Sequence, residues 1–338
     1  MKFGYVTPFS RPEHRIASVE YAHTAEAHGY DGVWVPEAFG SDAFTLLGRI
    51  AGHTQRLHLS TGIVNIFSRT PALLAQSFAT LDEISGGRAR IGLGASGPLV
   101  IENWHGLAFD RPLRRMREVV AILRMALAGE RVNFEGEFFR LKGFSLLIKP
   151  FQPRIPIYLA TLKPQAIKVT GEIADGWLPI YLSVDALAQR LAPLDEGARV
   201  NGRRASVIDI PMSVLTAVDN DSAVARGLCA DHLAYYIGGM GTFYHELMHD
   251  IGFGEAADRI LACWKSGDRA AARDQVSAAM IRELTICGTP AECVAAIERR
   301  RTAGITHILL APPHGSSVAQ VQTTLRALSP RDLGLIGE

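Results

Sequence analysis

The sequence contains few cysteines and almost no net charge. Among 338 residues, the cysteines are Cys229, Cys263, Cys287 and Cys293, and no two of them are spaced as CxxC. This spacing excludes a disulfide framework and a zinc knuckle, and it is typical of buried thiols in a reducing compartment. Lysine and arginine total 35 against 34 acidic residues, which gives a formal net charge of +1. A chain so balanced has no electrostatic signature of a nucleic-acid or anionic-membrane partner.

Long apolar runs are also missing from the sequence. No window approaches about 18 uninterrupted apolar residues, so no transmembrane helix is predicted. The beginning of the chain is interrupted by Arg11, Glu13 and His14, which excludes a secretory signal. Hydrophobic residues nevertheless make up 48% of the chain, which is enough for a large core. We therefore predict a cytoplasmic enzyme that acts on a small molecule.

Short β-branched runs alternate along the chain with longer helical patterns. The runs predicted as strands cover residues 2–6, 32–35, 57–61, 88–93, 155–159, 176–180, 207–214 and 306–310. Helical periodicity is clearest at 71–84, where Leu74, Phe78 and Leu81 share one face. Gly29 is expected to end the first long helix, because the residue after a helix often adopts a left-handed backbone.

Eight recurring βα units predict a parallel sheet. At this chain length they favour a closed (β/α)8 TIM barrel over an open, doubly wound sheet. We expect a single barrel domain over residues 1–330, with a helical insertion at about 219–280 and a C-terminal tail at 331–338. In such a barrel the active site lies at the C-terminal ends of the strands.

The predicted strand ends contain few acidic or basic groups. Glu37 is the one carboxylate among them, and His105 lies on the loop after the fourth strand. Glycines and other small residues make up most of the remaining positions. This composition suits the binding of a flat, mostly apolar cofactor ring better than it suits hydrolysis by side chains.

Four short motifs border the predicted strands. They are Gly92-Leu93-Gly94-Ala95-Ser96-Gly97-Pro98, Trp104-His105-Gly106, Ser85-Gly86-Gly87-Arg88 and Ala174-Asp175-Gly176-Trp177. Together they resemble the motifs of the luciferase-like monooxygenase superfamily. The first two suggest its branch of coenzyme F420-dependent oxidoreductases. The resemblance extends over nearly the whole chain.

The resemblance implies a bacterial luciferase-like barrel with coenzyme F420, or alternatively FMN, across the strand ends, and hydride transfer at the central ring. It also implies a non-prolyl cis peptide at Gly62-Ile63, where an ordinary strand end is the alternative. The cofactor phosphate is expected after the fifth strand, beside Lys163 and the helix N-terminus at Pro164. The implied cofactor-binding residues are Glu37, Thr61, Gly62, Ile63, Ala95, Ser96, Gly97, Ala160, Thr161, Leu162, Lys163, Gly176 and Trp177.

Two departures from the family pattern bear on the substrate. In alcohol and sugar-phosphate dehydrogenases of this family a histidine follows the acidic residue of the second strand, whereas here Ala38 follows Glu37. A family glutamate of the fourth-strand loop is replaced by Ser96-Gly97. We therefore predict a reductase of a C=C or C=N bond, because hydride delivery depends mainly on orientation.

The proton source and the assembly stay open at this point. Glu37 or His105 could supply the proton, although Glu37 could equally be a structural carboxylate. The alternative function is an FMN-dependent luciferase-like monooxygenase that uses a separately reduced flavin. Barrels of this family often pair, so a homodimer is compatible with the resemblance.

The segment from His245 to His249 matches the HExxH pattern. On a helix this pattern places two imidazoles on one face, as zinc hydrolases require. The candidates for a third ligand, Glu255, Asp258 and Glu283, have no diagnostic spacing, and the motif falls in the predicted insertion rather than at a strand end. We interpret it as a polar helical face and expect no catalytic metal.

Overall fold

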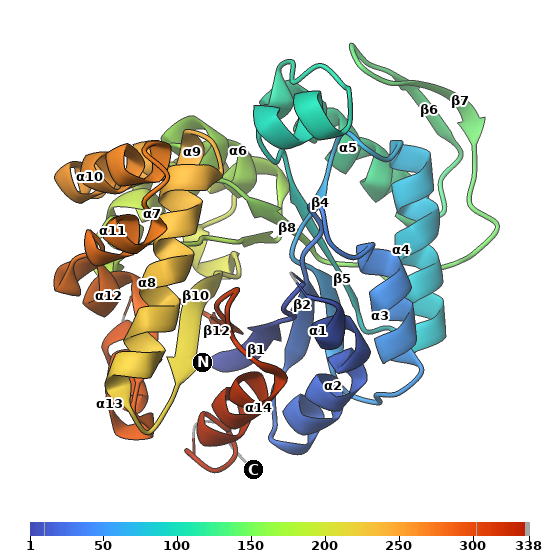
Figure 1. Ribbon diagram of the computed structural model, residues 1–338. Helices are drawn as coiled ribbons and strands as arrows, with labels where there is room; N and C mark the ends of the chain where they lie inside the picture. Colours follow the sequence, from blue (N-terminus) through green and yellow to red (C-terminus); the bar gives the residue numbers. More distant parts are fainter. Residues whose placement is uncertain (10, 302, 335–338) are drawn as a thin grey trace.

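In a computed structural model of the protein, which describes residues 1–9, 11–301 and 303–334, a parallel sheet curls around a central axis and helices cover its outside (Figure 1). The end of the expected tail, residues 335–338, lies outside the described residues. The strands are β1 (Lys2–Val6), β2 (Gly32–Val35), β3 (His58–Thr61), β4 (Val64–Asn65), β5 (Ala89–Gly94), β6 (Val132–Glu135), β7 (Arg140–Phe144), β8 (Ile157–Ala160), β9 (Gly176–Trp177), β10 (Pro211–Val218), β11 (Thr285–Gly288) and β12 (His307–Ala311).

The strand order of the sheet is β11-β10-β12-β1-β2-β3-β5-β8-β9, with β4 attached to β5. Its two sides meet through isolated parallel bridges that join Gly176 to Asp209 and Ile180 to Ser213. The ring therefore consists of β1, β2, β3, β5, β8, β9, β10 and β12, and β11 extends it along the C-terminal half of β10. This arrangement confirms the predicted (β/α)8 fold class.

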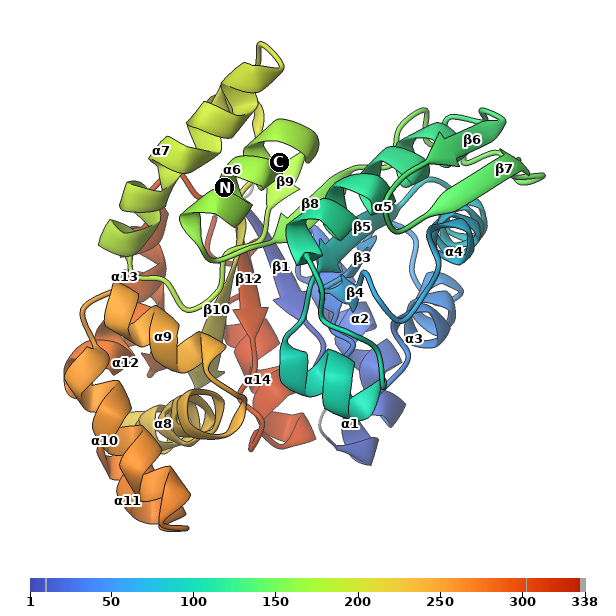
Figure 2. The same cartoon turned by 90° about the horizontal axis from the view of Figure 1, so that it is seen from above.

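Helices follow most strands and pack against the outside of the ring. The α-helices are α1 (Pro12–Ile16), α2 (Ser18–Ala27), α3 (Ala43–Ala51), α4 (Pro71–Ser85), α5 (Pro112–Leu127), α6 (Pro164–Ile173), α7 (Val184–Val200), α8 (Ser222–Gly239), α9 (Phe243–Asp250), α10 (Gly254–Lys265), α11 (Arg269–Asp274), α12 (Ala278–Leu284), α13 (Pro290–Arg301) and α14 (Val318–Ala327). A π-helix, η1 (Leu99–Trp104), and a 3-10 turn, η2 (Ala205–Val207), complete the helical elements. Helices α8 to α12 gather on one side of the sheet, opposite α3, α4 and α5 (Figures 1 and 2).

Local sequence signals explain where the helices begin and end. The side chain of Thr70 accepts a hydrogen bond from the amide of Leu73, and Pro71 occupies the first turn of α4. The same helix ends at Gly86, whose φ of 68° is left-handed. Gly29 also has a left-handed φ, of 83°, as expected for the residue that terminates α2.

The predicted strands coincide with the ring strands to within a few residues. The structure differs from the prediction at the start of β10 and in the short strands β4 and β11, which were not predicted. The segment predicted as a strand from 207 starts at the last residue of η2, and β10 begins only at Pro211. The short strand β11 was not predicted, because its four residues directly follow helix α12 and show no alternation of their own. The hairpin of β6 and β7, which follows α5 and precedes β8 in the sequence, projects from the barrel at the upper right of Figure 1.

The inside of the ring is filled by aromatic and aliphatic side chains. The rings of Trp34 and Tyr158 meet edge to face with centroids 5.2 Å apart, and Leu178 and Leu309 pack against them. A Cβ atom on Gly176 would lie 2.2 Å from the Tyr158 ring, so only glycine allows this packing. The barrel interior is therefore a packed core, and open space begins only beyond it.

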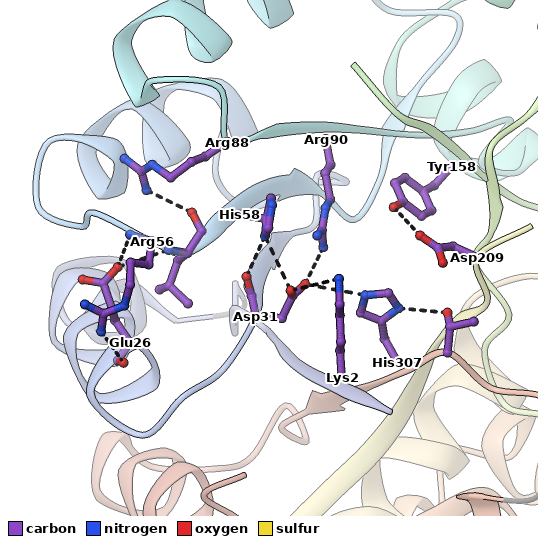
Figure 3. A network of polar contacts seen from close by, with 12 residues as sticks. Lys2, Glu26, Asp31, Arg56, His58, Arg88, Arg90, Tyr158, Asp209 and His307 are labelled. Carbon is purple, nitrogen blue, oxygen red and sulfur yellow. Dashed lines mark hydrogen bonds and ion pairs between the residues drawn. The ribbon is translucent and has the colours of Figure 1, made fainter. Parts of the chain in front are cut away.

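A network of charged side chains ties together the N-terminal ends of the ring strands (Figure 3). Asp31, just before β2, lies 2.7 Å from Arg90 of β5 and 3.6 Å from Lys2 of β1, His58 of β3 and His307 of β12. Burial alone would raise the pKa of Asp31, but His307 and Arg90 outweigh it and hold this pKa well below its usual value. One carboxylate thus links five strands.

None of the helices among the described residues is long and apolar enough to cross a membrane.

Candidate functional site

A cavity opens at the C-terminal ends of the ring strands. It encloses about 210 Å³, which is below the usual range of about 300–1,000 Å³ for small-molecule sites. It is lined by Val6, Thr7, Pro8, Phe9, Trp34, Pro36, Gly62, Ile63, Ala160, Leu178, Pro179, Ile180, Tyr181, Ser213, Leu215, His232, Tyr236, Tyr244, Leu309, Ala311, Pro312 and His314. Within the described part of the chain this lining contains no aspartate, glutamate, lysine or arginine.

The base of the cavity contains three of the residues predicted to bind the cofactor. Gly62, Ile63 and Ala160 all line it, and the Gly62-Ile63 peptide bond is cis, which confirms the predicted isomer. The backbone around this bond is anchored on both sides. The amide of Gly62 donates to the carbonyl of Val35, and the carbonyl of Ile63 accepts from the amide of Glu37. The cis peptide is therefore held against the end of β2.

A cluster of tyrosines and histidines forms one wall of the cavity, and sequence reasoning missed it. Tyr181 follows β9, His232 and Tyr236 lie one turn apart on α8, Tyr244 lies on α9, and His314 follows β12. The rings of His232 and Tyr236 stack at a centroid distance of 4.6 Å. Helical spacing of His232 and Tyr236 was the one local signal, and it did not reveal that this face of α8 covers the barrel mouth.

Hydrogen bonds in this wall determine the tautomer of a buried histidine. The backbone amide of His314 donates to Nδ1 of His232, so Nδ1 carries no proton. In a neutral imidazole the proton then lies on Nε2, which is 2.7 Å from the hydroxyl oxygen of Tyr181. His232 therefore donates to Tyr181, and the hydroxyl proton of Tyr181 remains available to a molecule in the cavity.

The wall is uncharged at neutral pH. Burial lowers the pKa of His232 well below its usual value, and the neighbouring His314 adds to the effect. Burial also lowers the pKa of His314 to about 4. It raises the pKa of Tyr181 well above its usual value and that of Tyr244 to about 12. These side chains can orient a ligand by hydrogen bonding without placing a formal charge beside it.

Other predicted cofactor residues are buried in structural contacts. The hydroxyl of Thr61 donates to the carbonyl of Gly92 and accepts from its amide, which joins β3 to β5. The indole Nε1 of Trp177 donates to the carbonyl of Thr161, and Gly176 is buried against Tyr158. Their roles in cofactor binding remain predictions.

The predicted residues of the loop after β5 lie near the rim but outside the cavity lining formed by the described residues. Ala95 packs against the core, and Ser96 has a left-handed φ of 59°. A Cβ atom on Gly97 would contact the ring of Phe243 at 3.4 Å, which brings this loop next to the start of α9. Leu162 packs against the core on the loop after β8.

Lys163 is the N-terminal capping residue of α6, where a phosphate was predicted. Its side chain is exposed, and Nζ donates to Glu246 of α9 at 2.8 Å. This bond raises the pKa of Lys163, so the side chain stays cationic. The helix N-terminus and the charge are both present, but Glu246 competes for the charge.

The two predicted catalytic residues share a separate, shallow depression. Glu37 and His105 line it together with Arg69 and Asp42. The carboxylate of Glu37 accepts hydrogen bonds from Arg69 and, at 2.9 Å, from the amide of Ala43. Arg69 also pairs with Asp42. Glu37 therefore joins the loop after β2 to the start of α3, and its catalytic role, like that of His105, remains a prediction.

Comparison with known proteins gives consistent matches over almost the whole chain. The profile of the luciferase-like monooxygenase family matches residues 1–307. The chain is 34% identical over 287 residues to a Mycobacterium tuberculosis protein assigned to the coenzyme F420-dependent oxidoreductases, over 80% of this chain and 83% of the relative. It is 30% identical over 316 residues to the 5,10-methylenetetrahydromethanopterin reductase of Methanolobus tindarius, over 93% of this chain and 95% of the relative.

A solved structure agrees with these matches. The coenzyme F420-dependent tetrahydromethanopterin reductase from Methanopyrus kandleri superposes with a TM-score of 0.85 over 97% of each chain, at 26% sequence identity.

Proposed function

The chain belongs to the luciferase-like monooxygenase family, and from this premise we propose that it is a coenzyme F420-dependent oxidoreductase that reduces a C=N or C=C bond of a small organic substrate. One observation supports this function above the others. The cavity at the barrel mouth is mostly apolar and is lined by no charged side chain among the described residues. Relatives that are 26% to 34% identical to this chain are named as F420-dependent oxidoreductases or as reductases.

The residues of the cavity fit a planar, largely apolar ring system. Gly62 and Ala160 present almost no side chain at its base, and Ile63 offers an aliphatic surface. When bound, the reduced deazaflavin supplies a hydride. The chain itself contributes orientation and exclusion of water, which are the main requirements for hydride transfer between two closely positioned groups.

Tyr181 is the group best placed to assist the substrate. Its hydroxyl accepts a hydrogen bond from His232 and can donate its own proton into the cavity. We assign Tyr181 the role of hydrogen-bond or proton donor to the substrate atom next to the carbon that receives the hydride. His232 would stabilise the negative charge that develops on the tyrosine oxygen. Glu37 and His105 remain the alternative proton donors.

A cofactor titration tests the proposed function directly. Purified protein freed of bound small molecules is titrated with F420 and, separately, with FMN, and binding is followed by fluorescence. We expect saturable F420 binding and at least tenfold weaker binding of FMN. Tight FMN binding without F420 binding would instead reject the F420-dependent function and favour the FMN-dependent alternative. Failure of both cofactors to bind would refute either function.

The role of Tyr181 is tested by reduction kinetics. A panel of cyclic iminium compounds and enones is screened for oxidation of reduced F420. With any accepted compound, Tyr181→Phe should lower turnover about 10- to 100-fold while F420 affinity stays within twofold. Glu37→Gln and His105→Asn are the matched variants. If one of these variants loses turnover and Tyr181→Phe does not, the residue replaced in that variant is the proton donor instead of Tyr181.

A further inference from the structure

Three side chains that the proposed function does not use converge between α9 and α10. His245 and His249, one helical turn apart on α9, each place Nε2 at 2.9 Å from the same carboxylate oxygen of Asp258 on α10. The two imidazole rings have centroids 4.8 Å apart. One potential ligand atom from each of the three residues lies within 4.8 Å of the others.

We propose that His245, His249 and Asp258 form a binding site for a divalent transition-metal ion such as Zn²⁺, which clamps α9 to α10. Two imidazole nitrogens and one carboxylate oxygen are a favoured ligand set for zinc. Donor atoms held by one tetrahedral zinc ion lie about 3.4 Å apart, given metal–ligand distances of about 2.1 Å. The observed separations differ from this value by about 1.5 Å at most, which small side-chain rotations can accommodate.

The surroundings favour the convergence of these side chains. Gly254 begins α10 next to His249, and a Cβ atom there would lie 2.5 Å from Nδ1 of the imidazole. Glycine therefore allows His249 to lie flat against the neighbouring helix. The side chain of His245 is only 18% exposed, whereas those of His249 and Asp258 are 46% and 58% exposed, so the site is open to an ion from one side.

The glutamate of the HExxH pattern shows that this site is not hydrolytic. A zinc hydrolase of this type uses that glutamate as a general base beside the metal. Here Glu246 turns instead to Lys163, with its carboxylate 2.8 Å from Nζ. The spacing of the motif therefore supplies two ligands but no catalytic base.

The proposed metal site lies beside the wall of the cavity. Tyr244 of the cavity wall directly precedes His245, and Glu246 connects the same helix to the loop after β8. An ion shared with α10 would hold α9 in place against these contacts. We expect metal binding to stabilise the wall of the cavity without taking part in hydride transfer.

Calorimetric titration with Zn²⁺ tests the proposal. The full-length protein, without a polyhistidine tag and after treatment with a chelator, should bind about one Zn²⁺ per chain. His249→Ala and Asp258→Asn should each weaken the binding at least tenfold. His53→Ala is the matched control, because it removes an exposed histidine near β3 that lies 6.2 Å from His23 ring to ring. This control should bind Zn²⁺ as the wild type does.

Thermal unfolding supplies a second measurement. Zn²⁺ should raise the melting temperature of the wild type and of His53→Ala by several degrees and leave Asp258→Asn unchanged. Asp258 is more than half exposed, so this variant is expected to fold. Equal Zn²⁺ affinity in wild type, His249→Ala and Asp258→Asn would overturn the proposal, as would binding that disappears only when cysteines are replaced. Neither result would bear on F420 binding.

Discussion

The two ends of the barrel use polar residues in opposite ways. At the N-terminal end, Asp31 gathers Lys2, His58, Arg90 and His307 into a network of paired charges (Figure 3). At the C-terminal end, the cavity wall consists of neutral tyrosines and histidines, and the described lining contains no charged side chain.

This difference in polar residues assigns stability to the N-terminal end of the barrel and ligand binding to the C-terminal end. Charges that satisfy one another within the protein hold strand ends in register but present nothing to a ligand. Neutral donors such as the hydroxyl of Tyr181 retain an unused proton and face open space. Conserving a stable closed end while varying the other is the general way in which a barrel supports different chemistries. Each of the following predictions tests this separation.

The largest effect is expected from Asp31→Asn. The variant leaves the guanidinium of Arg90, whose side chain is 7% exposed, without its carboxylate. We expect a loss of about 3–5 kcal/mol in the free energy of unfolding, measured by urea denaturation. F420 affinity of the folded fraction should stay within twofold. Asp110→Asn is the control, because Asp110 is exposed and paired with exposed Arg111. An Asp31→Asn variant that is as stable as the wild type but has lost F420 binding would show that this end serves binding rather than stability.

His314 at the cavity and Asp31 at the opposite end should respond to acid in different pH ranges. His314 has a folded pKa of about 4 against a usual value of 6.5, so the unfolded chain binds more protons between these values. Its contribution to stability therefore falls as pH falls from about 6.5 to about 4, by about 1.4 kcal/mol per pH unit at most. Asp31 has a depressed folded pKa, so its contribution is complete above the usual value of 3.8 and is lost only below it.

The variant His314→Asn isolates this effect. The pH dependence of wild-type stability does not isolate His314, because burial and Arg90 also lower the pKa of His58 at the opposite end of the barrel. The difference in unfolding free energy between wild type and His314→Asn should change between pH 6.5 and 4 and be constant above pH 7. A difference that stays constant across the acid range would show that His314 is not buried as a neutral group.

The smallest effect is expected from Lys163→Ala. If Lys163 attracts the cofactor phosphate, F420 affinity should fall about twofold to fivefold at low salt and less at high salt, because the charge is exposed and screened. Lys168→Ala is the control, since Lys168 lies on the same helix and pairs with Glu196 in a comparable exposed contact. Equal affinity of wild type and Lys163→Ala at every salt concentration would remove Lys163 from the binding site.

Local patterns in the sequence predicted most of the scaffold. The ring strands and the location of a site at the strand ends follow from local patterns and from their order along the chain. The family and the cis peptide at Gly62-Ile63 were predicted from the resemblance that short motifs carry. The floor of the cavity was identified for the same reason, since Gly62 and Ala160 end strands whose place in the ring is determined by the repeat.

The wall of the cavity could not be predicted in this way. Tyr181, His232 and Tyr244 come from separate segments, and two of them lie on helices α8 and α9 beyond the repeating βα units. Nothing in the sequence states which face of α8 covers the barrel mouth. The role of Glu37 was open for a similar reason, because its partner Arg69 lies more than 30 residues away on the far side of β3.

The sequence by itself determined the barrel, because alternation of apolar strands and amphipathic helices at this length has few other ways to bury its hydrophobic surface. Only the tertiary structure decided which polar groups face the ligand, which face each other, and which pair of histidines meets a distant carboxylate. Those outcomes depend on distances between segments far apart in the chain, and such distances are set by packing of the whole rather than by any local pattern.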